Sequence, residues 1–292
     1  MAISAFLVRL TLSNLVTELL IFLIGVAVSA FGVLIGFGGG VFMVPILIIF
    51  FQFPIELAIG SAMCALLPAS VISTAFNFRE KSIDYVVASL LQPTSMLGTV
   101  IGAFLVAYMP VLQMQFLFAL FVTVTGVYML ATYKKKQKKK KGMLYRINRM
   151  PTSFIRKNHS RHTAYRLNGS LLAFLGLCTG TLAGLFGVGG GFLQTPLMIK
   201  AFKIPSQIAI STSLFILIIT SLTGISSHYW LGHIDWTRSL PLMLAFAVGA
   251  LLGKGLLKKR ASSQQSSERL IGVGLLLAGM SVVAHIFIKY DF

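Results

Sequence analysis

Two glycine-rich stretches contain the residues whose type and spacing could do chemistry. Gly36-Phe37-Gly38-Gly39-Gly40 and Gly187-Val188-Gly189-Gly190-Gly191 each precede a short apolar run, which starts at Val41 in the first case and at Phe192 in the second. A helix that begins at such a point leaves its first N–H groups without partners and carries a partial positive charge there. Because glycine has no Cβ, a small anion can approach this backbone closely. The predicted anion-binding backbone consists of Gly38, Gly39, Gly40, Val41, Gly189, Gly190, Gly191 and Phe192.

Glycines also serve other purposes, and two of these are weighed against the anion site. Small residues let membrane helices pack closely. We favour this packing role for Gly98/Gly102 and Gly249/Gly253, which are spaced as GxxxG, and it remains an open alternative for the triple glycines. A nucleotide-binding loop needs a soluble βαβ unit with an acidic residue about 20 positions later. The flanking residues here are apolar and no Gly-Lys-Ser/Thr follows, so we reject that class.

Polar side chains follow both glycine stretches. We predict that Ser61, Thr212 and Ser213 reach the glycine region, because prolines shortly before them can turn the chain back, and Gln194 is a further binding candidate. A transport path or gate could be formed by Ser70, Asn77, Ser221 and His228. Two alternatives stay open: the hydroxyls bond to their own helix backbone, and His228 is a plain hydrogen-bonding residue at the membrane interface.

Asp84 and Asp235 each stand before a long apolar run. A carboxylate at the start of a helix accepts hydrogen bonds from its free N–H groups and stabilises its positive end. We therefore expect helix capping at both positions, with proton transport as the other role that a carboxylate could have here.

The remaining reactive residue types form no catalytic pattern. Cys64 and Cys178 lie in apolar runs without metal-ligand spacing, and both are expected to pack in the core. The sequence contains no visible nucleophile–base pair, paired carboxylates or metal-ligand cluster. We predict that the protein is no enzyme and needs no cofactor or metal.

Composition places all these residues in a membrane. Of the 292 residues 56% are hydrophobic and 11% charged, whereas a soluble domain has about 25% charged residues. Ten apolar runs are visible, at residues 15–36, 41–52, 55–78, 86–108, 111–133, 169–188, 192–202, 208–231, 239–257 and 269–288. Since a membrane helix needs about 20 residues, the runs at 41–52 and 192–202 are too short to cross. We expect an all-α polytopic membrane protein.

The chain repeats itself at a shift of 151 positions, which aligns Gly36 with Gly187, Pro45 with Pro196 and Asp84 with Asp235. About five helical segments per repeat is an odd number, so we predict two inverted repeats whose short glycine-broken helices meet near the midplane. The Lys and Arg residues of corresponding loops differ, as inversion requires. Residues 79–84 contain Arg79 and Lys81 where 230–235 contain no Lys or Arg, and residues 254–269 contain five Lys and Arg where 108–114 contain none. Parallel repeats with four spans each are the alternative.

These observations divide the chain into an N-terminal extension (1–14), a first transmembrane repeat (15–133), a basic linker (134–168) and a second repeat (169–292). Residues 134–166 carry thirteen Lys and Arg and no acidic residue. Such a segment is typical of a cytoplasmic loop that contacts anionic lipid headgroups. We expect no nucleic-acid partner, a cytoplasmic linker and both termini outside.

The doubled motif resembles the sulfite exporter TauE/SafE family, also called the 4-toluene sulfonate uptake permease family. The matching residues are Gly36-Phe37-Gly38-Gly39-Gly40-Val41-Phe42-Met43-Val44-Pro45, Gly187-Val188-Gly189-Gly190-Gly191-Phe192-Leu193-Gln194-Thr195-Pro196, Ser211-Thr212-Ser213-Leu214, His228 and Gly232-His233-Ile234-Asp235-Trp236. The resemblance covers residues 18–133 and 169–287 and departs at Asn77, where the family tends to carry His. It implies transport of small sulfur-containing anions or organic sulfonates across the bacterial cytoplasmic membrane.

The combined prediction is a secondary transporter in the bacterial inner membrane that moves sulfite or an organosulfonate by alternating access. Two helix starts would hold the anion and hydroxyls would orient it. An anion channel with the same site and a non-transporting membrane scaffold are the competing classes.

Overall fold

The computed structural model describes residues 2–134, 153–158, 163–257 and 264–290. The first repeat consists of α1 (Ala2–Ile35), α2 (Gly40–Phe50), α3 (Ile55–Arg79), α4 (Tyr85–Tyr108) and α5 (Val111–Lys134). The second consists of α7 (Gly169–Phe186), α8 (Gly191–Ala201), α9 (Ser206–Trp230), α10 (Trp236–Leu252), the π-helical turn η2 (Gly253–Leu257) and α11 (Gln264–Tyr290). Between them lies an antiparallel hairpin of β1 (Ser153–Asn158) and β2 (Thr163–Asn168).

The helical bundle has the architecture of a polytopic membrane protein. Within the described residues, six helices are long and apolar enough to cross a membrane: α1, α3, α4, α7, α9 and α10. In contrast, α2 and α8 have 11 residues each, about 16 Å of helix against a hydrocarbon core of about 30 Å. The all-α polytopic class is confirmed, and the two short runs are half-length helices. Residues 2–14 of the expected extension continue α1.

The long helices pack through small residues. A Cβ on Gly98 or Gly102 of α4 would lie 2.3 or 2.1 Å from a carbonyl oxygen of α7, and Gly249 of α10 approaches α1 as closely, at 2.4 Å from Val26 O. Gly253, in η2, would meet Ala30 O of α1 at 2.6 Å. The structure confirms the packing interpretation of both GxxxG pairs.

One expectation about the cysteines is wrong. Cys64 is buried, whereas Cys178 is exposed. Gly176 and Gly180 face α4, and Cys178 stands two residues from each, so it points to the opposite side of α7. In a membrane helix that side can face lipid.

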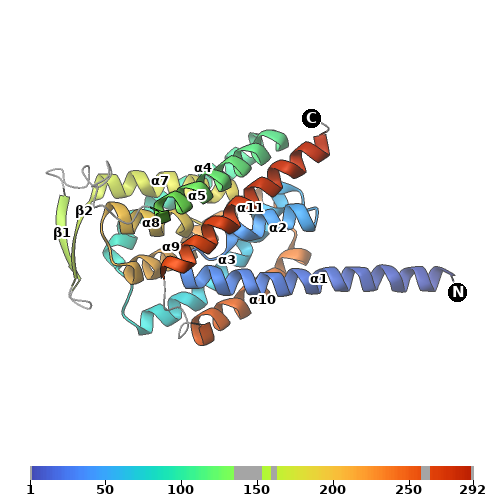
Figure 1. The fold of residues 1–292 in the computed structure, drawn as a ribbon, viewed down its shortest axis with the longest axis horizontal. Helices are drawn as coiled ribbons and strands as arrows, with labels where there is room; N and C mark the ends of the chain where they lie inside the picture. Colours follow the sequence, from blue (N-terminus) through green and yellow to red (C-terminus); the bar gives the residue numbers. More distant parts are fainter. Residues whose placement is uncertain (1, 135–152, 159–162, 258–263, 291–292) are drawn as a thin grey trace.

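The hairpin and the chain ends lie at opposite ends of the bundle. Figure 1 shows β1 and β2 at one end and both termini at the other. The hairpin belongs to the basic linker, for which the sequence analysis predicted no strands. Tyr165 and Leu167 of β2 are buried against α4 and α7 residues such as Val87 and Leu171. The linker is therefore docked on the bundle through alternate residues of one strand.

Candidate functional site

Each glycine stretch interrupts the helical backbone between a long helix and a half-length helix. Gly36, Gly38 and Gly39 have φ values of 89°, 75° and 100°, and Gly187 and Gly189 have 65° and 66°. These left-handed conformations strain any residue with a Cβ, so the two chain breaks require glycine at these positions. The first break joins α1 to α2, and the second joins α7 to α8.

The two breaks contact each other directly. A Cβ on Gly40, the first residue of α2, would lie 2.8 Å from the carbonyl oxygen of Gly187. A Cβ on Gly191, the first residue of α8, would lie 3.0 Å from the carbonyl oxygen of Gly36. The two contacts are equivalent, because a shift of 151 positions converts Gly40 into Gly191 and Gly36 into Gly187. The start of each short helix thus faces the break of the other repeat, and we call this region the crossing.

The starts of α2 and α8 retain free donors at the crossing. Within the described ranges, the N–H groups of Gly39, Gly40 and Val41 donate to no backbone carbonyl, and neither do those of residues 190–192. The N-cap residues Gly39 and Gly190 provide no side-chain cap. Both helix starts therefore present unpaired N–H groups and positive dipole ends.

Two leucines, missed by the sequence analysis, fill the space beside the glycines. A Cβ on Gly38 would lie 2.6 Å from a methyl group of Leu66 and 2.7 Å from one of Leu217. A Cβ on Gly189 would meet the same two side chains at 2.8 and 2.4 Å. Leu66 of α3 and Leu217 of α9 occupy equivalent positions in the two repeats, and both are fully buried. Their equivalence under the 151-residue shift is the signal that could have found them.

Two hydroxyl groups of the second repeat lie at the crossing. The hydroxyls of Thr195 and Ser213 lie 2.6 Å apart, and each is 3.2 Å from the carbonyl oxygen of Gly36. Their equivalents in the first repeat are Val44 and Ala62, which are buried and apolar. The structure thus places Ser213 at the crossing, adds Thr195, and makes the site asymmetric.

Gln194 lies beside the start of α8. Its Nε2 donates to Ser95 Oγ of α4 at 3.1 Å and to Thr179 Oγ1 of α7 at 3.3 Å. Its Oε1 is buried without a partner in the described structure. A Cβ on Gly190 would lie 2.8 Å from this amide nitrogen. Gln194 therefore connects the glycine break to two long helices.

Ser61 and Thr212 have other partners. Thr212 Oγ1 accepts from the backbone N–H of Asp84 at 3.0 Å, and Ser61 Oγ accepts from Ser239 Oγ at the same distance. Both hydroxyls tie α3 or α9 to the neighbouring helix start of the other repeat. The structure brings neither of them to the crossing, because they lie on a different helix face from Leu66 and Leu217.

The predicted path residues divide into two kinds. Ser70 Oγ donates to Leu67 O of its own helix at 2.8 Å. Three further hydroxyls near Ser221 on α9, those of Thr220, Thr223 and Ser227, likewise bond to their own helix. The backbone-bonding alternative therefore holds for these hydroxyls. Ser221 Oγ differs, because it is buried without a hydrogen-bond partner among the described residues.

Asn77 and His228 hold equivalent positions with different chemistry. His228 is fully buried near the end of α9. Its Nε2 lies 3.0 Å from Gly184 O, and its Nδ1 lies 3.1 Å from Nδ1 of His233. A carbonyl only accepts, so Nε2 of His228 carries the proton and, in the neutral ring, Nδ1 accepts from His233. Asn77 Oδ1 instead accepts from Lys254 Nζ at 2.8 Å.

His233 belongs to the loop between α9 and α10. Burial lowers the pKa of His233 below its usual value of 6.5, and the nearby Glu56 carboxylate opposes this shift. The neutral ring is thus favoured in the folded protein, in agreement with its role as hydrogen-bond donor to a neutral His228.

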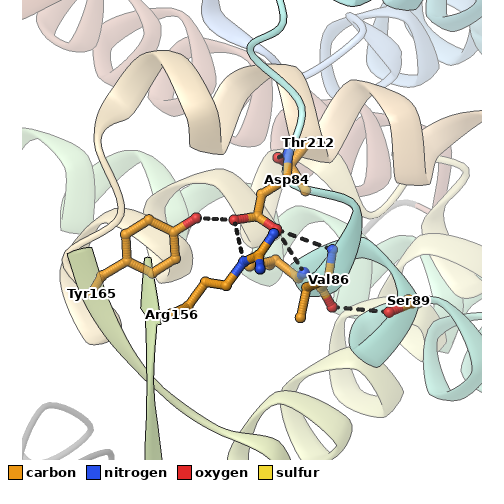
Figure 2. Close-up of polar contacts among 7 residues, drawn as sticks. Asp84, Val86, Ser89, Arg156, Tyr165 and Thr212 are labelled. Atoms are coloured by element: carbon orange, nitrogen blue, oxygen red, sulfur yellow. Dashed lines mark hydrogen bonds and ion pairs between the residues drawn. The ribbon is translucent and has the colours of Figure 1, made fainter. Parts of the chain in front are cut away.

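Asp84 and Asp235 are the N-cap residues of α4 and α10. Asp84 Oδ1 accepts from the N–H groups of Val86 and Val87, and Asp235 Oδ1 accepts from that of Thr237. Figure 2 shows a further set of contacts at Asp84 that has no counterpart in the sequence analysis. Its other oxygen accepts from the hydroxyl of Tyr165 and lies 3.5 Å from Nε of Arg156, both from the hairpin.

The equivalent Asp235 has a simpler environment. Its carboxylate lies 3.5 Å from Arg238 of the same helix, with both side chains partly exposed. Asp84 is 1% exposed. The hairpin therefore gives one of two equivalent caps a buried position and partners from a distant part of the chain.

Comparison with known proteins places these features in a family. The sequence model of the family described as sulfite exporter TauE/SafE matches residues 21–282. The chain is 26% identical to the probable membrane transporter protein YunE of Bacillus subtilis over 89% of this chain and 95% of that protein. It is 25% identical to the probable membrane transporter protein MJ0441 of Methanocaldococcus jannaschii over 78% and 80% of the two chains.

A plant protein is also similar over a shorter region. Sulfite exporter TauE/SafE family protein 1 of Arabidopsis thaliana is 30% identical over 45% of this chain and 30% of that protein. No solved structure matches the chain significantly.

Proposed function

Because the chain belongs to the sulfite exporter TauE/SafE family of membrane transporters, we propose that it is a secondary transporter for a small sulfur-containing anion, sulfite or an organosulfonate. The proposed mechanism is alternating access between two inverted repeats in the cytoplasmic membrane of a bacterium. The anion binds at the crossing of the two glycine breaks.

The observation that carries this proposal is the meeting of two helix starts that retain unpaired N–H groups. Backbone N–H donors at a positive helix end are suited to the oxygen atoms of an anion. The hydroxyls of Thr195 and Ser213 lie beside the same backbone. An oxyanion could thus be bound by main-chain donors and oriented by side-chain hydroxyls from one repeat.

Leu66 and Leu217 provide the gate in this proposal. Both contact both glycine breaks, so they occupy the space beside the N–H groups that an anion would take. Anion binding requires these side chains to move, and each belongs to a different long helix, α3 or α9. Their displacement would couple binding to a movement of α3 against α9.

We place the hairpin end of the bundle in the cytoplasm and both termini outside. Asp84 contacts the hairpin, so the loop with Arg79 and Lys81 lies at the hairpin end. Basic loops favour the cytoplasmic side, and both termini lie at the opposite end of the bundle (Figure 1). Export would then follow the membrane potential, since one negative charge leaving an inside-negative cell gains about 2.3 kcal/mol per 100 mV.

The test is uptake of labelled sulfite and of a taurine-like sulfonate into liposomes that contain the purified protein, with and without an imposed voltage. Gly190→Leu is the informative variant. Gly190 has a right-handed backbone, and the three atoms nearest to an added Cβ all belong to the flexible amide end of Gln194. The matched control is Gly169→Leu, because nothing lies within 4 Å of a Cβ on Gly169.

We expect saturable, voltage-sensitive uptake that Gly169→Leu retains. Gly190→Leu should reduce it by at least about tenfold, since it blocks the approach to charge-assisted hydrogen bonds. Uptake that is accelerated by unlabelled substrate trapped inside the liposomes would identify a carrier. Uptake without this acceleration would identify a channel. Absence of flux with every sulfur anion, in protein that folds normally, would refute the substrate class. Normal flux in Gly190→Leu would refute the site.

A further inference from the structure

The end of α10 holds a cation that forms no salt bridge within the part of the chain that the structure describes. Lys254 is half-buried in the first turn of η2. Its Nζ donates to Asn77 Oδ1 of α3 at 2.8 Å. The salt bridges found in the described residues involve Asp84 and Asp235, not Lys254. A neutral amide oxygen is thus the partner of a charge at the end of a membrane helix, where charged groups are ordinarily paired.

The side-chain amide of Asn77 has a hydrogen-bond donor that is not used. The Lys254 ammonium can only donate, so it fixes the amide of Asn77 with Oδ1 toward the lysine and Nδ2 away from it. The Nδ2 atom is buried without a hydrogen-bond partner in the described structure, and Asn77 is 1% exposed. The ammonium and the unused amide N–H therefore belong to two directly hydrogen-bonded side chains, and an oxyanion is a ligand that can accept from both.

The pair lies on the helix face that leads from the crossing. Asn77 follows Leu66 by eleven residues on α3, about 16 Å along the axis and within about 20° of the same face. The loop after α3 contacts the hairpin through Asp84. At the equivalent position His228 uses both ring nitrogens in contacts with Gly184 and His233. The free N–H group and the cation therefore occur beside Asn77, at the hairpin end of α3, and not beside the equivalent His228 of α9.

We propose that Lys254 and Asn77 form a second anion site, at which the transported sulfur oxyanion is loaded on the hairpin side before it reaches the crossing. This inference rests on the proposed function. It predicts that the pair sets the apparent affinity for substrate arriving from that side.

Asn77→Asp separates this role from a structural one. The carboxylate has nearly the shape of the amide, keeps the contact with Lys254 and neutralises its charge. If the pair only stabilises the fold, Asn77→Asp should preserve or strengthen that effect. If the pair binds an anion, Asn77→Asp should abolish the binding. Lys81→Gln is the matched control, because it removes one exposed positive charge from the loop after α3.

The first measurement is the KM for labelled sulfite applied from the hairpin side, in liposomes of phosphatidylcholine alone. We expect Asn77→Asp to raise KM by roughly tenfold, the loss of one charge-assisted hydrogen bond, while the maximal rate changes little. Lys81→Gln should retain the wild-type KM. An unchanged KM in Asn77→Asp would overturn the proposal. So would an effect confined to liposomes that contain anionic lipid, because the pair would then bind a headgroup.

A binding measurement separates this proposal from the crossing. In Gly190→Leu, where the crossing is blocked, sulfite should still raise the melting temperature, because a ligand stabilises the state that binds it. Adding Asn77→Asp should abolish that shift. A shift that survives in the double variant, or none in Gly190→Leu alone, would overturn the second site. Neither result depends on whether the protein transports sulfite.

Discussion

Asp84 and Asp235 provide a matched pair for testing what the hairpin contributes to stability. They occupy equivalent positions and cap equivalent helices, but only Asp84 is held by Tyr165 and Arg156. We predict that Asp84→Ala destabilises the protein much more than Asp235→Ala does. The comparison removes most of the loss of the cap itself, because Asp84 accepts from two N–H groups of its helix and Asp235 from one.

The expected magnitudes follow from the contacts. Loss of an N-cap costs about 1 kcal/mol, and Asp235 adds only a partly exposed ion pair worth less than about 1 kcal/mol. At Asp84 the Tyr165 hydroxyl loses a buried carboxylate acceptor, a contact worth about 1.5–3 kcal/mol. We expect losses of about 3 kcal/mol for Asp84→Ala and about 1 kcal/mol for Asp235→Ala.

The assay is equilibrium unfolding in detergent micelles, completed as a double-mutant cycle. Tyr165→Phe should lower the free energy of unfolding by about 2 kcal/mol in the wild type and by almost nothing in Asp84→Ala. Equal losses in the two aspartate variants would refute the reasoning. Additive effects of Tyr165→Phe and Asp84→Ala would show that the hydroxyl contact contributes nothing.

Three other predictions concern the crossing, the helix packing and the loop histidine. Replacing both Leu66 and Leu217 by Ala should increase anion leak through the protein, measured as uncoupled flux in liposomes, because both side chains contact both glycine breaks; an unchanged leak would count against the gate. Gly180→Ala should destabilise the α4–α7 contact and lower the melting temperature, since its Cβ would lie 2.1 Å from a carbonyl oxygen, whereas Gly169→Ala should not. His233 has a folded pKa below 6.5, so the unfolded state binds more protons and stability should decrease as pH falls below that value. His233→Gln should flatten this part of the stability–pH curve, and an identical curve would contradict the assignment.

Much of the architecture could be predicted because it depends on local pattern. Apolar runs of about 20 residues identify membrane helices by length alone, and the 11-residue helices after each triple glycine follow from the same count. The repeat at 151 positions aligns both breaks from the sequence alone. The GxxxG pairs were also interpreted correctly, because a helix face without side chains favours close approach.

The contacts that make the site could be found only in the tertiary structure. Ser61 and Thr212 were expected at the crossing but bond to Ser239 and Asp84, because a helix turns each residue by about 100° and the face toward the crossing belongs to Leu66 and Leu217. The hairpin was missed because its short strands depend on docking against α4 and α7.

The same distinction explains the partners of the charged residues. Asn77 and Lys254 are 177 positions apart, and Asp84 and Tyr165 are 81 positions apart. Sequence patterns report periodicity within one helix and equivalence between repeats, so they located Asp84 and Asn77 as residues of interest. Which cation or hydroxyl meets them is decided by how the helices of the two repeats pack, since side-chain contacts over such separations depend on the relative position of whole helices.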